Sequence, residues 1–196
     1  KGTSLVLGLG VAVVLGRTLG AEGYGIYAFT LSIVTMLSLP AAVGLPQVLT
    51  RETSKNHARG DWAAVAGLWR WGPRVSLVLS AAIALGGLAT LRVLGDRVGE
   101  VLGTTLTVGL LLVPISVLNA LRGSSLRGLG NVIQGQVPEL AVRPVAFLLL
   151  VVLVPFVVDE RRLTPPLAMA TNVLATTIAF SVGAVLLYRV SGLSLH

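Results

Sequence analysis

Six long stretches without a charged residue dominate the chain. They are Gly2–Gly16, Gly23–Thr50, Val75–Leu91, Val101–Leu121, Pro144–Val158 and Leu163–Tyr188, with lengths of 15, 28, 17, 21, 15 and 26 residues. A helix needs about 20 apolar residues to cross a hydrocarbon core of roughly 30 Å. Four of the stretches reach or approach that length. The sequence therefore predicts a membrane protein with about six transmembrane helices.

The low charge content supports this interpretation. Charged residues make up 12% of the chain, apolar residues 54%, and the mean hydropathy is +0.87. A soluble domain is usually about a quarter charged. The apolar stretches are continuous and lack the two-residue alternation of barrel strands. Because hydrocarbon leaves only helices and closed barrels as spanning structures, we expect an all-α polytopic fold.

The two shortest stretches each have an explanation. The first begins next to Lys1, with no initiator Met, and we expect the natural N-terminus to lie further upstream. The fifth is expected to extend backwards through Leu140 and Val142. Glu139 and Arg143 would then lie at the membrane interface, where long charged side chains can reach water.

The distribution of charge predicts an orientation. Alternate connections on one side carry three acids and ten bases, and the latter are Lys1, Arg51, Lys55, Arg59, Arg70, Arg74, Arg122, Arg127, Arg143 and Arg189. The opposite side carries five bases and five acids, so the whole net charge of +7 falls on one side. Basic loops stay in the cytoplasm. We expect a multi-pass protein of the cytoplasmic (inner) membrane with both ends of this chain inside.

The aromatic residues fit the same arrangement. Tyr and Trp favour the two membrane interfaces. We expect Tyr24 and Tyr27 at the outer boundary, and Trp62, Trp69, Trp71 and Tyr188 at the inner one. The segment from Trp62 to Trp71 is a candidate for a short amphipathic helix lying in the inner interface.

The sequence offers little for catalysis. It contains no cysteine and two histidines, His57 and His196, which cannot form a zinc cluster. The Gly123–Gly128 segment lacks the Lys and Ser/Thr that follow the second glycine of a phosphate loop. We therefore expect no enzyme activity, no cofactor and no metal. We also expect no nucleic-acid partner, because the membrane topology explains the basic residues.

Six polar residues are candidates for a substrate path. Four are arginines near helix ends, and two are amides within apolar stretches; they are Arg51, Arg122, Arg127, Arg143, Gln47 and Asn119. The arginines could hold the topology or bind an anion, since Arg forms bidentate bonds to phosphate. The amides could join helices or line a hydrated path. We further expect no acidic residue in mid-membrane, with Glu139 the nearest.

Several motifs resemble one transporter family. The segment from Gly16 to Phe29, with Arg17, Leu19, Gly20 and Tyr24-Gly25, is similar to the first outer loop of polysaccharide flippases, which carry O-antigen and other lipid-linked oligosaccharides. The other matching segments are Gly44-Leu45-Pro46-Gln47, Arg51-Glu52-Thr53-Ser54, Leu121-Arg122-Gly123, Leu126-Arg127-Gly128-Leu129-Gly130 and Arg143-Pro144.

This resemblance implies a function and a domain organisation. Residues 1–196 would form the N-terminal six-helix lobe of a two-lobe transporter, truncated at both ends. The partners would be the C-terminal lobe, membrane lipids and an isoprenoid-pyrophosphate-linked glycan, which alternating access would move to the outer leaflet. A multidrug or organic-cation exporter of the same superfamily is the alternative, and it would want a mid-membrane carboxylate. A non-transporting membrane scaffold is a third possibility.

Cysteine labelling can test the orientation, because the native chain has no cysteine. We expect Asn56→Cys to be protected from an impermeant maleimide in intact cells and Asp96→Cys to react. The reason is the difference of seven charges between the two sides. Labelling of Asn56→Cys with protection of Asp96→Cys would contradict the topology.

Overall fold

Helices make up nearly all of the computed structural model. It describes the backbone of residues 2–157 and 163–193, and the side chains of residues 8–95, 97–154 and 163–190. The elements are α1 (Gly2–Ala42), α2 (Leu45–Ala58), α3 (Trp62–Leu94), the 3₁₀ turn η1 (Gly95–Val98), α4 (Glu100–Leu110), α5 (Leu112–Gly128), α6 (Val132–Val137), the π-helical turn η2 (Pro138–Val142), α7 (Arg143–Val157) and α8 (Pro165–Leu193). Within that part of the chain there is no strand, so the all-α fold class is confirmed.

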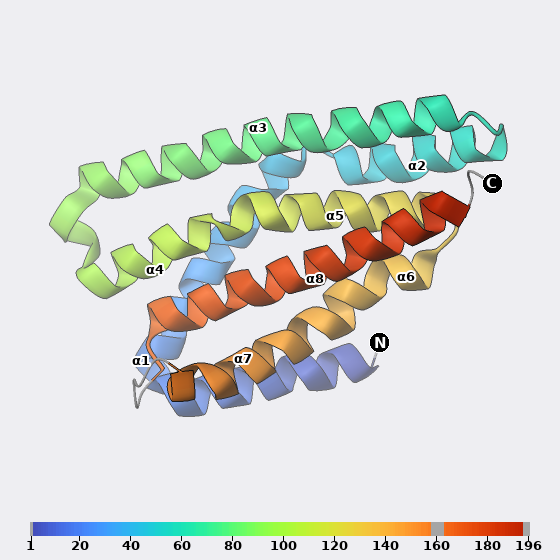
Figure 1. Ribbon diagram of the computed structural model, residues 1–196. Coiled ribbons are helices and arrows are strands. Elements are labelled where there is room, and N and C mark those ends of the chain that lie inside the picture. The colour runs from blue at the N-terminus through green and yellow to red at the C-terminus, as the bar shows by residue number, and fades with distance from the viewer. Residues whose placement is uncertain (1, 158–162, 194–196) are drawn as a thin grey trace.

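The first helix contains a reversal at Gly20. Its backbone has φ 71° and ψ 177°, a conformation that glycine adopts readily and other residues do not. Figure 1 shows α1 as two arms of different direction, and the second arm leads away toward α2. The arms correspond to the first two predicted helices. Among the described residues, five helical spans are long and apolar enough to cross a bilayer, and the first, Gly8–Ala42, includes residues of both arms.

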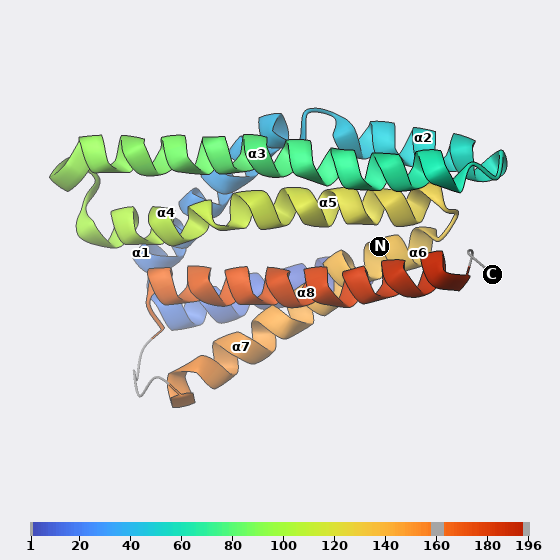
Figure 2. The same cartoon turned by 45° about the horizontal axis from the view of Figure 1, so that its top comes forward.

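Two further passes are assembled from shorter elements. α4 and α5 follow each other in one span from Glu100 to Gly128, and α6, η2 and α7 in one from Val132. The predicted backward extension of the fifth helix is thus confirmed. In Figures 1 and 2, α3, α5 and α8 lie side by side, and successive connections alternate between the two ends of the bundle.

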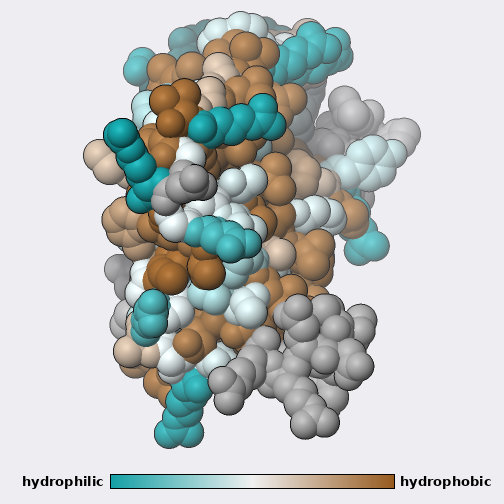
Figure 3. Space-filling view, turned by 90° about the vertical axis from the view of Figure 1, so that its left-hand side faces the viewer, coloured by the Kyte–Doolittle hydropathy of each residue, from teal (hydrophilic) through white to brown (hydrophobic). Residues whose placement is uncertain are grey.

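The basic connections lie together at one end of the bundle. The α2–α3 and α5–α6 connections and the end of α8 lie at this end in Figure 1, and the first arm of α1 begins on the same side of the bundle. The opposite end is shown in Figure 3, where hydrophilic side chains are scattered among hydrophobic ones. The predicted neutral loop with Arg161 and Arg162 lies outside the described residues. Which end faces the cytoplasm stays a prediction.

The segment from Trp62 to Trp71 is not a separate interfacial helix. It forms the first turns of α3, which continues unbroken to Leu94 despite Pro73. Asp61 caps the helix, since its Oδ1 accepts a hydrogen bond from the Ala64 amide at 3.0 Å. The charged and aromatic residues of this segment therefore lie on the end of a transmembrane helix, and the prediction of an interfacial helix was wrong.

Helix α5 lies at the centre of the packing. It contacts α1, α2, α3, α4, α6 and α8, and most of its side chains are buried. Glycines allow its pass to approach its neighbours closely. A Cβ at Gly109 would lie 2.6 Å from Thr30 Cγ2, and one at Gly128 2.6 Å from Thr53 Cβ. Small residues at such contacts are how helices associate where the solvent is as apolar as leucine.

Candidate functional site

A polar network crosses the bundle between four passes. Its members are Tyr27 on the second arm of α1, Asn119 on α5, Glu139 on η2, Arg143 at the start of α7 and Asn172 on α8. Tyr27, Asn119 and Asn172 are each buried, with 4% of their surface exposed. Polar groups in this setting need partners inside the protein, because hydrocarbon supplies none.

Hydrogen bonds join the members in a chain, although the buried Asn119 Oδ1 has no partner. Arg143 donates through one terminal nitrogen to Glu139 Oε1 at 2.5 Å, and through the other to Asn172 Oδ1 at 3.3 Å. Asn119 Nδ2 donates to the second Glu139 oxygen, so both carboxylate oxygens are engaged. Asn172 Nδ2 in turn donates to the Tyr27 hydroxyl at 2.7 Å. The network joins α1, α5, α7 and α8, and its single ion pair makes it neutral overall.

The backbone at Glu139 is unusual. Residues Pro138–Val142 form one π-helical turn inside an otherwise α-helical pass. Proline at the start of this turn has no amide hydrogen to donate. Single π turns occur frequently at functional sites, since the extra residue changes the direction of nearby side chains. Here the turn lies immediately before Arg143 and contains its partner Glu139.

The network borders a cavity of about 250 Å³. Both polar and apolar residues line it. They are Gly8, Val11, Tyr27, Leu31, Glu139, Leu140, Arg143, Pro144, Phe147 and Asn172. The side chains of Arg143 and Glu139 remain 26% and 42% exposed, which agrees with a place on the cavity wall. The rings of Tyr27 and Phe147 stack beside it, with centroids 6.2 Å apart. The cavity can offer hydrogen bonds and an aromatic surface to a small polar group.

Two charged residues lie further into their helical pass than the apolar stretches indicated. Arg143 lies 11 residues after Val132 and 14 before Val157, near the middle of its pass rather than at the interface. Glu139 is only four residues away and binds side chains within the bundle. An acidic residue is therefore present within a candidate membrane span. Both charges can lie there because they form an ion pair and each also hydrogen-bonds an asparagine side chain. These contacts offset the cost of removing the charges from water.

Three members of the network, Tyr27, Glu139 and Asn172, are not among the six predicted substrate-path residues. Tyr27 was expected in the outer aromatic belt, but it is buried and bonded to Asn172. Asn172 lies inside the apolar stretch Leu163–Tyr188, so the criterion that singled out Gln47 and Asn119 would also have found it. A tyrosine near a helix end gives no such signal, because its partner is visible only in the fold.

Arg122 is directed elsewhere, into the contact between α5 and α8. One terminal nitrogen donates to the carbonyl oxygens of Ala179 at 2.9 Å and Phe180 at 3.1 Å. The residue is buried, with 6% exposed. Gly183 provides the space, since a Cβ there would lie 1.2 Å from the Arg122 nitrogen. Arg122 thus joins two helices.

The other predicted site residues do not join the network. Arg127 donates to Ser124 Oγ at 2.7 Å, on its own helix. Arg51 is exposed at the basic end and lies 3.7 Å from Glu52. Gln47 is exposed and lines a separate hollow near the start of α2. Arg122, Arg127 and Arg143 therefore have separate partners, and no bond joins them to one another among the described residues.

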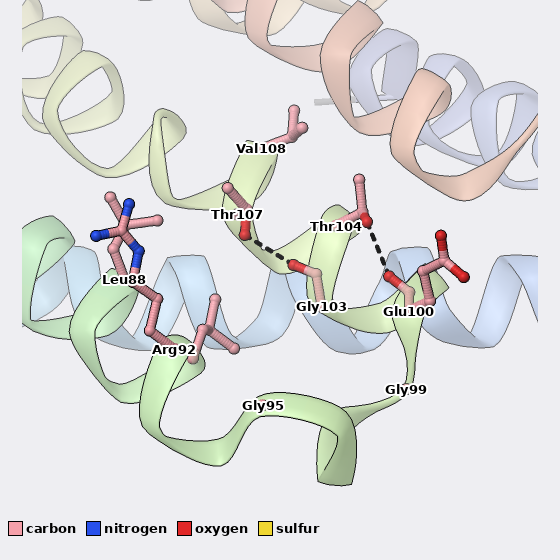
Figure 4. Close-up of a pocket in the computed structure, with 10 residues that line it drawn as sticks. Leu88, Arg92, Gly95, Gly99, Glu100, Gly103, Thr104, Thr107 and Val108 are labelled. Atoms are coloured by element: carbon pink, nitrogen blue, oxygen red, sulfur yellow. Dashed lines mark hydrogen bonds between the residues drawn. The ribbon is translucent and has the colours of Figure 1, made fainter.

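A second cavity, of about 630 Å³, lies at the neutral end between α3 and α4. Figure 4 shows Arg92 on one side of it and Glu100 on the other, with Thr104 and Thr107 between them. The two threonine hydroxyls donate to backbone carbonyls of Glu100 and Gly103 at 2.8 and 2.9 Å. Their donors are already in use, so this cavity offers fewer directed contacts than the network does.

The comparison with protein families decides the assignment. Residues 1–192 match the family model described as "Polysaccharide biosynthesis protein". The chain belongs to this family. The match covers nearly the whole sequence, so the network and the helices that form it all fall within the polysaccharide biosynthesis family region. No curated protein and no solved structure matches the chain.

Membership gives the coarse function. The polysaccharide biosynthesis family is a family of transporter-type membrane proteins, and the apolar helices identify this member as a multi-pass membrane protein. The resemblance drawn from the short motifs is thereby confirmed at the level of the family.

The Arg122 contact in this family member can be tested on its glycine. We expect Gly183→Ala to destabilise the protein by about 3 kcal/mol, because the new methyl group displaces a buried guanidinium from two carbonyls. Gly86→Ala is the matched control, since a Cβ at Gly86 meets nothing within 4 Å. Thermal unfolding in detergent gives the comparison, and equal midpoints for the two variants would contradict the contact.

Proposed function

We propose that this chain forms the substrate-binding wall of a flippase for an isoprenoid-pyrophosphate-linked oligosaccharide or polysaccharide precursor. The observation that carries the proposal is the polar network beside a cavity in mid-bundle, in a member of the polysaccharide biosynthesis family. A glycan head group is costly to move through hydrocarbon, because its hydroxyls lose their hydrogen bonds to water. Polar groups halfway across the membrane reduce that cost.

The chemistry of the cavity suits a sugar. Hydroxyl groups can donate to Glu139 and accept from Arg143 and Asn172, while a sugar ring packs on Phe147 or Tyr27. Pockets that enclose a drug-sized ligand measure about 300–1,000 Å³. A cavity of about 250 Å³ holds only part of a large head group. This agrees with one wall of a cleft whose other wall is a C-terminal lobe, with alternating access between the two.

The organic-cation exporter gains one observation from the structure. Glu139 supplies the mid-membrane carboxylate that such a transporter would need. Both its oxygens are engaged, however, and Arg143 already balances its charge at 2.5 Å. A cation would have to displace that arginine, whereas a neutral hydroxyl can join the existing bonds. The neutral network therefore favours a glycan over a cation.

Transport by the full-length protein tests the proposal. We expect Arg143→Gln to lower the flipping of an isoprenoid-pyrophosphate-linked glycan in liposomes by about tenfold or more, because a charge-assisted hydrogen bond contributes about 1.5–3 kcal/mol. Arg97→Gln, an exposed arginine at the neutral end, should leave the rate unchanged. Protein amount and orientation are measured in parallel.

A double variant separates substrate binding from charge balance. Combining Arg143→Gln with Glu139→Gln restores neutrality without restoring the arginine, so the proposal predicts that transport stays low. Recovery of the wild-type rate in the double variant would show that Arg143 only balances Glu139. Loss of ethidium efflux instead of glycan flipping would favour the cation exporter.

A further inference from the structure

A groove of about 300 Å³ opens between α3, α5 and α8, away from the polar network. Its walls are mostly apolar and include Leu118, Leu121 and Leu187. Trp69 and Tyr188 lie at the part of the groove nearest the basic end, because Trp69 is close to the start of α3 and Tyr188 close to the end of α8. Arg122 is the only charged residue among those that line it.

The guanidinium of Arg122 is not fully hydrogen-bonded. Its bonds to Ala179 and Phe180 use one terminal nitrogen, whereas Nε is buried and has no hydrogen-bond partner. Within the described part of the chain no carboxylate forms an ion pair with it, and Glu139 is paired with Arg143. Backbone carbonyls do not neutralise a full charge. The groove therefore contains a cation without an ion-pair partner among the described residues, and an anion that joined it would offset part of the cost of its burial.

The position of this cation in the groove defines the shape of a ligand. Leu118 lies one helical turn from Arg122 toward the middle of the membrane, and Leu121 lines the same wall. Trp and Tyr side chains favour the level of lipid head groups. A molecule with a phosphate near Arg122 and an aliphatic chain running toward the bilayer centre meets every one of these features.

The surroundings favour an anionic lipid over a neutral one. Arg70 and Arg74 on α3 and Arg189 on α8 are exposed near the same end of the bundle. Such basic residues attract anionic head groups, and basic pockets between transmembrane helices bind them. We propose that the groove binds one anionic phospholipid from the leaflet at the basic end, with its phosphate on Arg122 and one acyl chain along Leu118. This site does not depend on the transport function.

The intrinsic fluorescence of Trp69 reports on the groove. The variant Trp62→Phe/Trp71→Phe leaves Trp69 as the one tryptophan of the chain. It is reconstituted into phosphatidylcholine bilayers that contain increasing fractions of brominated phosphatidylglycerol or brominated phosphatidylcholine. We expect half-maximal quenching at an about tenfold lower fraction of the anionic lipid than of phosphatidylcholine. The reason is that hydrogen bonds to a charged group raise affinity about tenfold or more.

Two neighbouring residues on α8 provide the matched variants. Ala184 lines the groove, so Ala184→Phe should fill it and abolish the preference for the anionic lipid, while Arg122 itself is retained. Val185 is 53% exposed and does not line the groove, so Val185→Phe should keep the preference. Equal quenching by both lipids in the parent protein, or an unchanged preference in Ala184→Phe, would overturn the proposal.

Competition distinguishes the sources of phosphate. Millimolar inorganic phosphate should not relieve the quenching, because the acyl chain supplies part of the affinity. An isoprenoid pyrophosphate should compete no better than unlabelled phosphatidylglycerol. Relief by inorganic phosphate would reveal a simple anion site, and stronger competition by the isoprenoid pyrophosphate would assign the groove to a transport substrate; either result would overturn the lipid site.

Discussion

Hydrocarbon offers no hydrogen-bond partner, and the Glu139–Arg143 ion pair is where this constraint acts most strongly on the fold. The pair lies near the middle of a membrane pass and is completed by Asn119 and Asn172. Removing one member of a buried pair leaves an uncompensated charge, at a cost of about 3–5 kcal/mol when burial is complete. The positions of α5, α7 and α8 relative to one another are therefore coupled to a single electrostatic contact.

The same constraint explains how α5 is held at the centre. Asn119 connects it to η2 through Glu139, and Arg122, three residues later, connects it to the carbonyls of α8. The first contact borders the cavity of the network and leaves its charged groups partly exposed, whereas the second depends on the space at Gly183 and borders the apolar groove between α3, α5 and α8. A substrate can reach the first. This difference separates the pair proposed to bind a transport substrate from an arginine that joins two helices and is proposed to bind a lipid.

The apolar stretches predicted the helices well, because length and hydropathy alone determine whether a segment can span a bilayer. They predicted poorly how far the charged residues lie within their helical pass. Glu139 and Arg143 were placed at the interface because an isolated charge belongs there. Their spacing of four residues allows the pairing on any helix, whereas the contact of Arg143 with Asn172, 29 residues further along the chain, is visible only in the fold. Tyr27 was missed for the same reason, since only the fold brings it to Asn172.

The central claim is that Glu139 and Arg143 stabilise each other. A double-mutant cycle with Glu139→Gln, Arg143→Gln and the combined variant, followed by denaturant unfolding in detergent, measures this interaction without a substrate. We expect each single variant to be less stable than the parent. The double variant should lose less than the sum of the two, by about 1 kcal/mol or more, which is within the range for contacting residues. Additive losses would contradict the account.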